Sequence, residues 1–208
     1  SDPTRAQTLI NFAVSDGIIV SVPVHSSFVR YIPSSSILLG EHLSQKEFSS
    51  LLHFANSEES KRSCPLCDAP GLEETRYAIK PPQVYTVGIA WTSGRESQAT
   101  IARVLEFVAE ALDFSRAETV AGVLPGWDGE SPLWMRLKGA MCYYGDHYVT
   151  YLRLPESPGS HDSAWFMLDD RTVRRVGPTW RDAAQSIVNS KFQPVALFYE
   201  WHGLSQFA

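Results

Sequence analysis

Between residues 133 and 200 the sequence alternates short apolar segments with tight polar connections. The segments are rich in β-branched and aromatic residues, as strands are, and read "LWMRLKGAMCYY", "HYVTYLRLP", "AWFMLDD", "TVRRVG" and "QPVALFYE". Most of these connections are short, and short connections join antiparallel strands, because parallel strands need a long crossover. We therefore predict an antiparallel sheet in this part of the chain, with the strongly apolar "QPVALFYE" as a central strand.

Three segments have the periodicity of helices. Residues 97–112 place apolar side chains on one helical face behind Ser97, which is a suitable N-cap. Residues 43–57 show the same spacing. "TWRDAAQSIVNS" predicts a short helix in which Thr179 is the N-cap and Asp182 follows three residues later.

Upstream of the long helix, four further segments are predicted to be strands: 17–24, 26–33, 75–80 and 84–91. Strands followed by helices and then more strands predict an α+β fold, an antiparallel sheet with a few helices packed on it. The chain has 208 residues, of which 44% are hydrophobic, enough for one sizeable domain or two small ones.

Composition argues against several classes of function. The net charge is −5 and basic residues form no stripe, so nucleic acid is not an expected partner. No apolar run approaches the ~20 residues of a membrane span, so no membrane association is expected. Three cysteines are too few for a disulfide framework and indicate a reducing, intracellular location, cytoplasmic or nuclear.

The candidate chemistry lies at one end of the predicted sheet. His147 begins one strand, and Asp169 and Asp170 end the next. Adjacent antiparallel strands can set an imidazole beside a carboxylate, which fixes the histidine tautomer and lets the other ring nitrogen act as a base toward a thiol. The alternative is a half-buried histidine without any catalytic role.

Four segments in this order, "GAMCYYGDHYVTYLRL", "WFMLDDRTVRRVG", "TWRDAAQSIV" and "QPVALFYE", resemble the C-terminal part of the ubiquitin-specific proteases, the peptidase C19 family. The "CYYG-x-HY" pattern is similar to a divergent branch that includes plant ubiquitin carboxyl-terminal hydrolase-related proteins and members labelled inactive. "FVRYIPSSSIL", "CPLC" and "PPQVYTVGIAW" resemble its fingers and palm. The resemblance implies a papain-like cysteine-protease scaffold, with fingers and palm strands in about 17–95 and the rest of the palm in 133–200.

The resemblance implies a role for each residue of the motif. His147 would be the catalytic base, Asp169 would orient it, and Asp170 would support the leaving end of the substrate tail. Gly145 and Tyr148 would lie beside the tail of ubiquitin, or of a ubiquitin-like protein. No cofactor would take part in the reaction.

Two features depart from the family pattern. Asp146 replaces the glycine that commonly precedes the histidine, and the loop before it is short. The family's "N-x-G-N-T-C-Y-x-N" nucleophile box has no counterpart in this sequence, which also begins without Met. Cys142 is expected to be a core residue rather than a substitute, because a reactive thiolate needs exposure and a cationic setting.

Two explanations of the missing box stay open. The chain is a partial domain (1–208) whose nucleophile-bearing thumb lies outside it, or it is a pseudoenzyme that serves as an interaction module in a larger complex. Both predict no hydrolysis by this chain alone, because a base without a nucleophile has nothing to activate.

The pair Cys64 and Cys67 forms a C-x-x-C knuckle in a polar loop. This spacing fits half of a tetrahedral structural zinc site, which His53 and Asp68 could complete. The alternative is a knuckle turn that has lost its metal.

Overall fold

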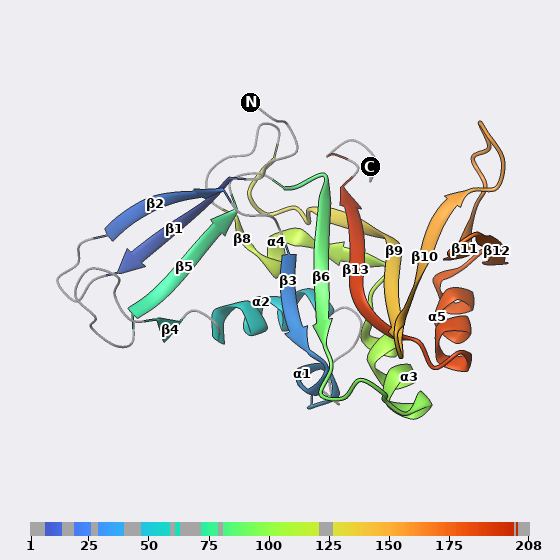
Figure 1. Ribbon diagram of the computed structural model, residues 1–208. Helices are drawn as coiled ribbons and strands as arrows, with labels where there is room; N and C mark the ends of the chain where they lie inside the picture. Colours follow the sequence, from blue (N-terminus) through green and yellow to red (C-terminus); the bar gives the residue numbers. More distant parts are fainter. Residues whose placement is uncertain are drawn as a thin grey trace.

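The computed structural model describes residues 7–13, 19–25, 29–39, 47–58, 61–62, 72–78, 81–120, 127–201 and 203. These residues form two sheets and a set of helices (Figure 1). Within the described residues, no helix is long and apolar enough to cross a membrane.

The larger sheet has eight strands, seven of them in the order β12-β11-β10-β9-β13-β6-β3, while β7 pairs with β9. Its strands are β3 (Val29–Pro33), β6 (Val84–Ala90), β7 (Ala111–Asp113), β9 (Trp134–Tyr144), β10 (His147–Pro155), β11 (Ser163–Asp169), β12 (Thr172–Gly177) and β13 (Gln193–Trp201). The strand β13 lies between β9 and β6, so the expectation of a central last strand is confirmed. The sheet is mixed rather than purely antiparallel, because β3 runs parallel to β6.

The smaller sheet has five strands in the order β2-β1-β5-β4, with β8 paired to β5. The strands are β1 (Gln7–Ala13), β2 (Ile19–His25), β4 (Lys61–Arg62), β5 (Leu72–Ala78) and β8 (Thr119–Val120). The strand β1 was not expected from the sequence, although its register with β2 and β5 runs over most of its length.

The helices are α1 (Ser34–Leu39), α2 (Phe48–Glu58), α3 (Gln98–Phe107), α4 (Phe114–Ala117) and α5 (Trp180–Asn189). Ser97 caps α3, and Thr179 and Asp182 form a reciprocal capping box at α5, as the sequence predicts. The helix predicted over 97–112 ends at Phe107, because the chain continues into β7, which pairs with β9.

One hydrophobic core joins the larger sheet to the helices. Alternate residues of the central strands are buried, as in β13, where Leu197 and Tyr199 are fully inaccessible. Trp165 of β11 packs on Trp180 of α5 with ring centroids 5.1 Å apart. The helices therefore cover one face of the sheet, which we call the helix face, and the opposite face is called the outer face.

A buried ion pair lies near the junction of the two sheets. The Nε of Arg30 in β3 donates to Oε1 of Glu118 at 2.6 Å, and its Nη2 donates to Oε2 at 2.8 Å. The hydroxyl of Tyr85 in β6 donates to the same Oε1 at 2.7 Å. Glu118 directly precedes β8 of the smaller sheet, whereas Arg30 and Tyr85 belong to strands of the larger sheet. The cluster therefore connects the two sheets.

Candidate functional site: a histidine–aspartate pair at the end of the larger sheet

A tight hairpin places His147 at the beginning of β10. Gly145 and Asp146 alone connect β9 to β10, and Tyr144 pairs with His147 across the turn. Gly145 has a φ of +64°, a left-handed conformation that favours glycine. The two-residue turn fixes the register of the hairpin, so it determines on which face of the sheet His147 lies.

His147 and Asp169 form the hydrogen bond that the sequence predicts. Asp169 is the last residue of β11, and the register of β10 with β11 pairs Thr150 with Leu168. His147 and Asp169 are therefore diagonal neighbours on one face of the two strands. The His147 Nε2 and the Asp169 Oδ1 are 2.6 Å apart, and the two side chains are 44% and 37% exposed.

This geometry assigns different roles to the two nitrogens of the imidazole. An ionised carboxylate can only accept hydrogen bonds, so Nε2 carries the proton and donates it to Asp169. In the neutral ring the lone pair is then on Nδ1. Nδ1 has no hydrogen-bond partner in the described part of the chain. The arrangement can therefore take a proton at Nδ1 while Asp169 stabilises the imidazolium that results.

Asp170 lies next to the pair, in the turn that connects β11 to β12. Its φ is +46°, a left-handed conformation that aspartate tolerates better than most residues. Its side chain is exposed, and one ligand atom each from His147, Asp169 and Asp170 lies within 4.8 Å of the others. Asp170 is thus placed to contact a molecule that approaches the pair from solvent.

Tyr148 lies on the outer face, the side of the sheet opposite His147. It pairs with Tyr143 of β9, and the two rings are 5.1 Å apart. The ring of Tyr148 is 55% exposed. Only a substrate that passes over the hairpin tip could contact both Tyr148 and His147.

Cys142 is part of the core, as the sequence predicts. It pairs with Val149 and is 0% exposed. Desolvation by burial raises the pKa of its thiol far above the ordinary range, so the thiolate is not formed at physiological pH. Cys142 therefore cannot be the nucleophile for His147.

Sequence reasoning missed an aromatic pair beside the histidine. Tyr144, the cross-strand partner of His147, is half exposed, and its ring lies 6.1 Å from that of Phe192, just before β13. The short turn between Tyr144 and His147 was the available signal, because it makes the two residues direct cross-strand neighbours. The pair forms an apolar wall at this end of the sheet.

Of the four residues predicted to bind a metal, the structure describes only His53. His53 is an exposed residue of α2. Cys64, Cys67 and Asp68 lie outside the described residues.

Comparison with known protein sequences finds similarity to ubiquitin carboxyl-terminal hydrolases. The chain is 26% identical over 188 residues to human ubiquitin carboxyl-terminal hydrolase 53, and 27% identical over 159 residues to mouse ubiquitin carboxyl-terminal hydrolase 54. These alignments cover 84% and 76% of the chain but only 16% and 9% of the relatives, so the chain spans less than a fifth of their length. No protein-family model matches the sequence.

Solved structures share the fold. The SAGA DUB module of Ubp8 and its partner subunits bound to monoubiquitin aligns with a TM-score of 0.54 and 11% identity, over 96% of this chain and 41% of that one. The Saccharomyces cerevisiae Pan2 pseudoubiquitin hydrolase–RNA exonuclease module aligns with a TM-score of 0.59 and 12% identity, over 96% of this chain and 33% of that one. The mixed sheet with a few packed helices is therefore a known architecture, found in a deubiquitinating and in a pseudoubiquitin hydrolase module.

Proposed function

We propose that this chain is the ubiquitin-recognising, base-bearing portion of a deubiquitinase-type cysteine protease. The observation that carries the proposal is the 2.6 Å contact between His147 Nε2 and Asp169 Oδ1, which leaves Nδ1 available to a thiol. The similarity to ubiquitin carboxyl-terminal hydrolases 53 and 54 supports ubiquitin, or a ubiquitin-like protein, as the ligand.

In the completed domain, His147 Nδ1 would take the proton of a cysteine supplied from outside this chain. The thiolate would attack the carbonyl carbon of the isopeptide bond that follows the C-terminal glycine of ubiquitin. As the C–N bond breaks, the imidazolium of His147 would return its proton to the departing lysine amine. Water would then hydrolyse the thioester, with His147 accepting the proton of the attacking water. Asp169 would hold the tautomer throughout.

The outer face of the larger sheet offers a surface for the protein ligand. Tyr31 and Tyr148 are 58% and 55% exposed, and the ring of Tyr31 lies over Gly88, where an added Cβ would be 2.5 Å from it. On the same face, the half-buried side chains of Leu152 and Phe198 lie beside Gly139, where an added Cβ would be 2.7 and 3.3 Å from them. Exposed aromatic side chains on one face of a sheet are suited to contact with a protein ligand.

We expect the isolated chain to bind ubiquitin without cleaving its conjugates. Tyr31→Ser together with Tyr148→Ser should weaken binding by about tenfold or more, because exposed aromatic anchors dominate interface energies. Phe54→Ser removes an equally exposed aromatic ring from α2 and is the matched control. Titration of isotope-labelled ubiquitin followed by NMR measures the affinities. Unchanged ubiquitin spectra at millimolar chain would contradict the proposal.

A second candidate function is a non-catalytic interaction module on the same scaffold. The observation that favours it is that Cys142, the one described thiol, is buried. In this case the chain would hold ubiquitin or a neighbouring subunit within a larger, intracellular complex. The two functions differ in whether the full gene product contains a reactive cysteine that reaches His147.

We also propose that Cys64 and Cys67 supply two thiolates to a structural zinc, with no part in catalysis. Two thiolates are half of the tetrahedral set that structural zinc requires, so two more ligands must come from the same chain, with His53 and Asp68 as the candidates. Purified chain should contain about one zinc per molecule, and Cys64→Ser with Cys67→Ser should contain none. Cys142→Ala is the control variant. Equal zinc content in all three proteins would remove the site.

A further inference from the structure

Four side chains form a row across four adjacent strands at the end of the larger sheet. Asp169 of β11 is hydrogen-bonded to His147 of β10, and His147 pairs with Tyr144 of β9. The register of β9 with β13 places Phe192 opposite Tyr144, and the two rings are 6.1 Å apart. The imidazole therefore has a carboxylate on one side and an aromatic pair on the other.

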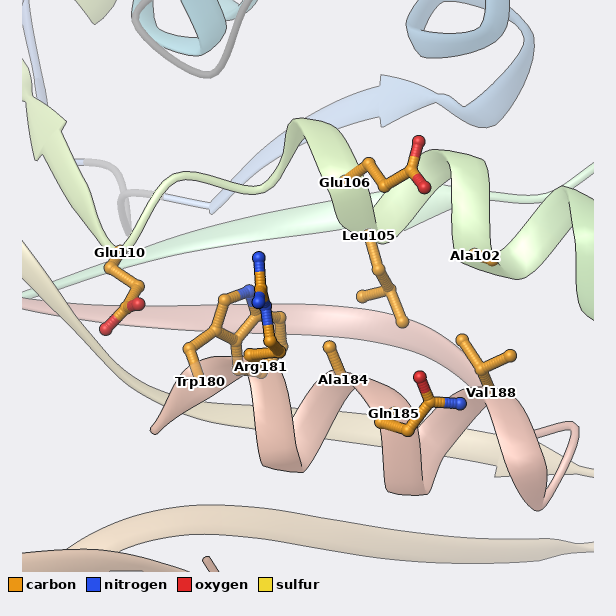
Figure 2. A pocket seen from close by; sticks show the side chains of 9 residues that line it. All are labelled: Ala102, Leu105, Glu106, Glu110, Trp180, Arg181, Ala184, Gln185 and Val188. Carbon is orange, nitrogen blue, oxygen red and sulfur yellow. The ribbon is translucent and has the colours of Figure 1, made fainter. Parts of the chain in front are cut away.

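The end of α5 that leads to Phe192 is anchored against α3. Figure 2 shows Val188 of α5 and Leu105 of α3 directed into the space between the two helices. The side-chain amide of Gln98, at the start of α3, donates to the carbonyl oxygens of Val188 and Asn189. The last turn of α5 is therefore held in place by contacts from outside the helix.

A Schellman motif extends this constraint to Phe192. The backbone N–H of Lys191 donates to the carbonyl oxygen of Val188 at 3.0 Å. The backbone N–H of Phe192 donates to the carbonyl oxygen of Ile187, also at 3.0 Å. Lys191 has a φ of +57°, the left-handed conformation that this motif requires. A lysine keeps this conformation only where the surrounding structure imposes it, so the position of Phe192 is well defined.

His147 needs a rigid neighbour, because its contact with Asp169 is exposed. The two side chains are 44% and 37% exposed, and an exposed pair holds its geometry weakly against water and side-chain entropy. Direct cross-strand neighbours have Cβ atoms about 5 Å apart, so the ring of Tyr144 is within reach of the imidazole. Tyr144 is itself half exposed, and its contact with Phe192 holds its ring.

We propose that Tyr144, held by Phe192, is a positioning residue for His147. Its ring occupies the side of the imidazole opposite Asp169 and excludes orientations in which Nε2 turns away from the carboxylate. Nδ1 then keeps the lone pair that a base requires. The catalytic importance of this role rests on the proposed function, whereas the orientation of the imidazole is a property of the chain by itself.

The tautomer of His147 is a readout that a purely structural role of Tyr144 would not change. Long-range proton–nitrogen NMR spectra distinguish a protonated from an unprotonated ring nitrogen, and the spectrum of His147→Ala identifies the signals. For the neutral ring in the wild-type chain we expect a proton on Nε2 and none on Nδ1. Tyr144→Ala should move the two nitrogen shifts toward each other, because the ring then exchanges between tautomers. Tyr144→Phe should restore the wild-type pattern, since it keeps the aromatic ring.

Two further variants locate the origin of the effect. Phe192→Ala should move the nitrogen shifts in the same direction as Tyr144→Ala, because it removes the support of the tyrosine ring. Tyr148→Ala removes a similarly exposed ring from the outer face of the same hairpin, with its contact to Tyr143, and should keep the wild-type tautomer. Circular dichroism verifies that each variant keeps the fold.

In the full gene product, Tyr144→Ala should lower kcat by about tenfold to a hundredfold with little change in KM, the size expected when a catalytic group is misplaced by about 1 Å. Tyr144→Phe should keep the wild-type kcat. A rise in KM alone would instead make the ring of Tyr144 a substrate contact and would contradict the positioning role.

Three NMR results would overturn the proposal. They are mixed tautomers in the wild-type chain, a wild-type tautomer in Tyr144→Ala, and equal changes in Tyr144→Ala and Tyr148→Ala. The NMR measurement requires neither ubiquitin nor the external cysteine. Absence of hydrolysis by the full gene product would therefore contradict the proposed function and leave the positioning of His147 by Tyr144 intact.

Discussion

Alanine in place of His147 should lower kcat/KM of the complete domain by about 10² to 10⁴, the usual contribution of a general acid–base group. The loss should fall on kcat, because without the imidazole the thiol stays protonated and the leaving amine receives no proton. Cleavage of a fluorogenic ubiquitin conjugate by the full gene product measures the effect.

Two aspartate variants separate the base from its surroundings. Asp169→Asn should lower kcat less than His147→Ala, because an amide oxygen can still accept from Nε2 and keep the tautomer, although it stabilises the imidazolium less. Asp170→Asn makes the same charge change one residue away and should raise KM without a comparable loss of kcat. Full activity of His147→Ala would show that the pair has no catalytic role.

Removal of the Glu118 carboxylate should lower the free energy of unfolding by about 3–5 kcal/mol, because it removes the buried carboxylate that accepts two hydrogen bonds from the buried Arg30 guanidinium. Glu118 and Arg30 are both nearly inaccessible, and two hydrogen bonds of 2.6 and 2.8 Å join them. The loss would be large beside the ~5–15 kcal/mol by which domains are stable. Urea unfolding of Glu118→Ala followed by circular dichroism measures it.

Two controls compare the buried Arg30–Glu118 ion pair with a partly exposed ion pair and with an apolar replacement. Glu200→Ala breaks the partly exposed ion pair with Lys138, 3.2 Å long, and should cost less than about 1 kcal/mol. The triple variant Arg30→Met, Glu118→Leu and Tyr85→Phe replaces the whole cluster by apolar groups and should be more stable than Glu118→Ala alone. Equal losses in the free energy of unfolding for Glu118→Ala and Glu200→Ala would mean that the buried ion pair stabilises the fold no more than the partly exposed one.

The sequence carries strong local information about the histidine–aspartate pair. Both residues lie at the ends of strands that follow each other in the chain, so one hairpin register brings them together. Cys142 could be assigned to the core because it lies among apolar residues in the middle of a strand pattern. The caps Ser97 and Thr179 precede helices whose hydrophobic period is clear.

Other features depend on contacts between distant segments. The helix predicted to reach Leu112 ends at Phe107, because residues 111–113 form β7 and pair with β9 instead of continuing the helix. The local sequence does not indicate this pairing, because it depends on a distant strand. The parallel pairing of β3 with β6 depends on a crossover whose partner strand cannot be read from either segment. Arg30 and Glu118 are 88 positions apart, so their contact exists only in the folded chain.

The reaction of the full gene product with ubiquitin bearing an electrophilic C-terminus tests the central claim most directly. We expect one ubiquitin adduct, mapped by mass spectrometry to a cysteine outside this chain, and a much slower reaction in His147→Ala because Nδ1 no longer activates that thiol. Cys142, buried and protonated, should stay unmodified. An adduct on Cys142, or no adduct on the folded full-length protein, would contradict the assignment of this chain as the base-bearing part of a thiol hydrolase.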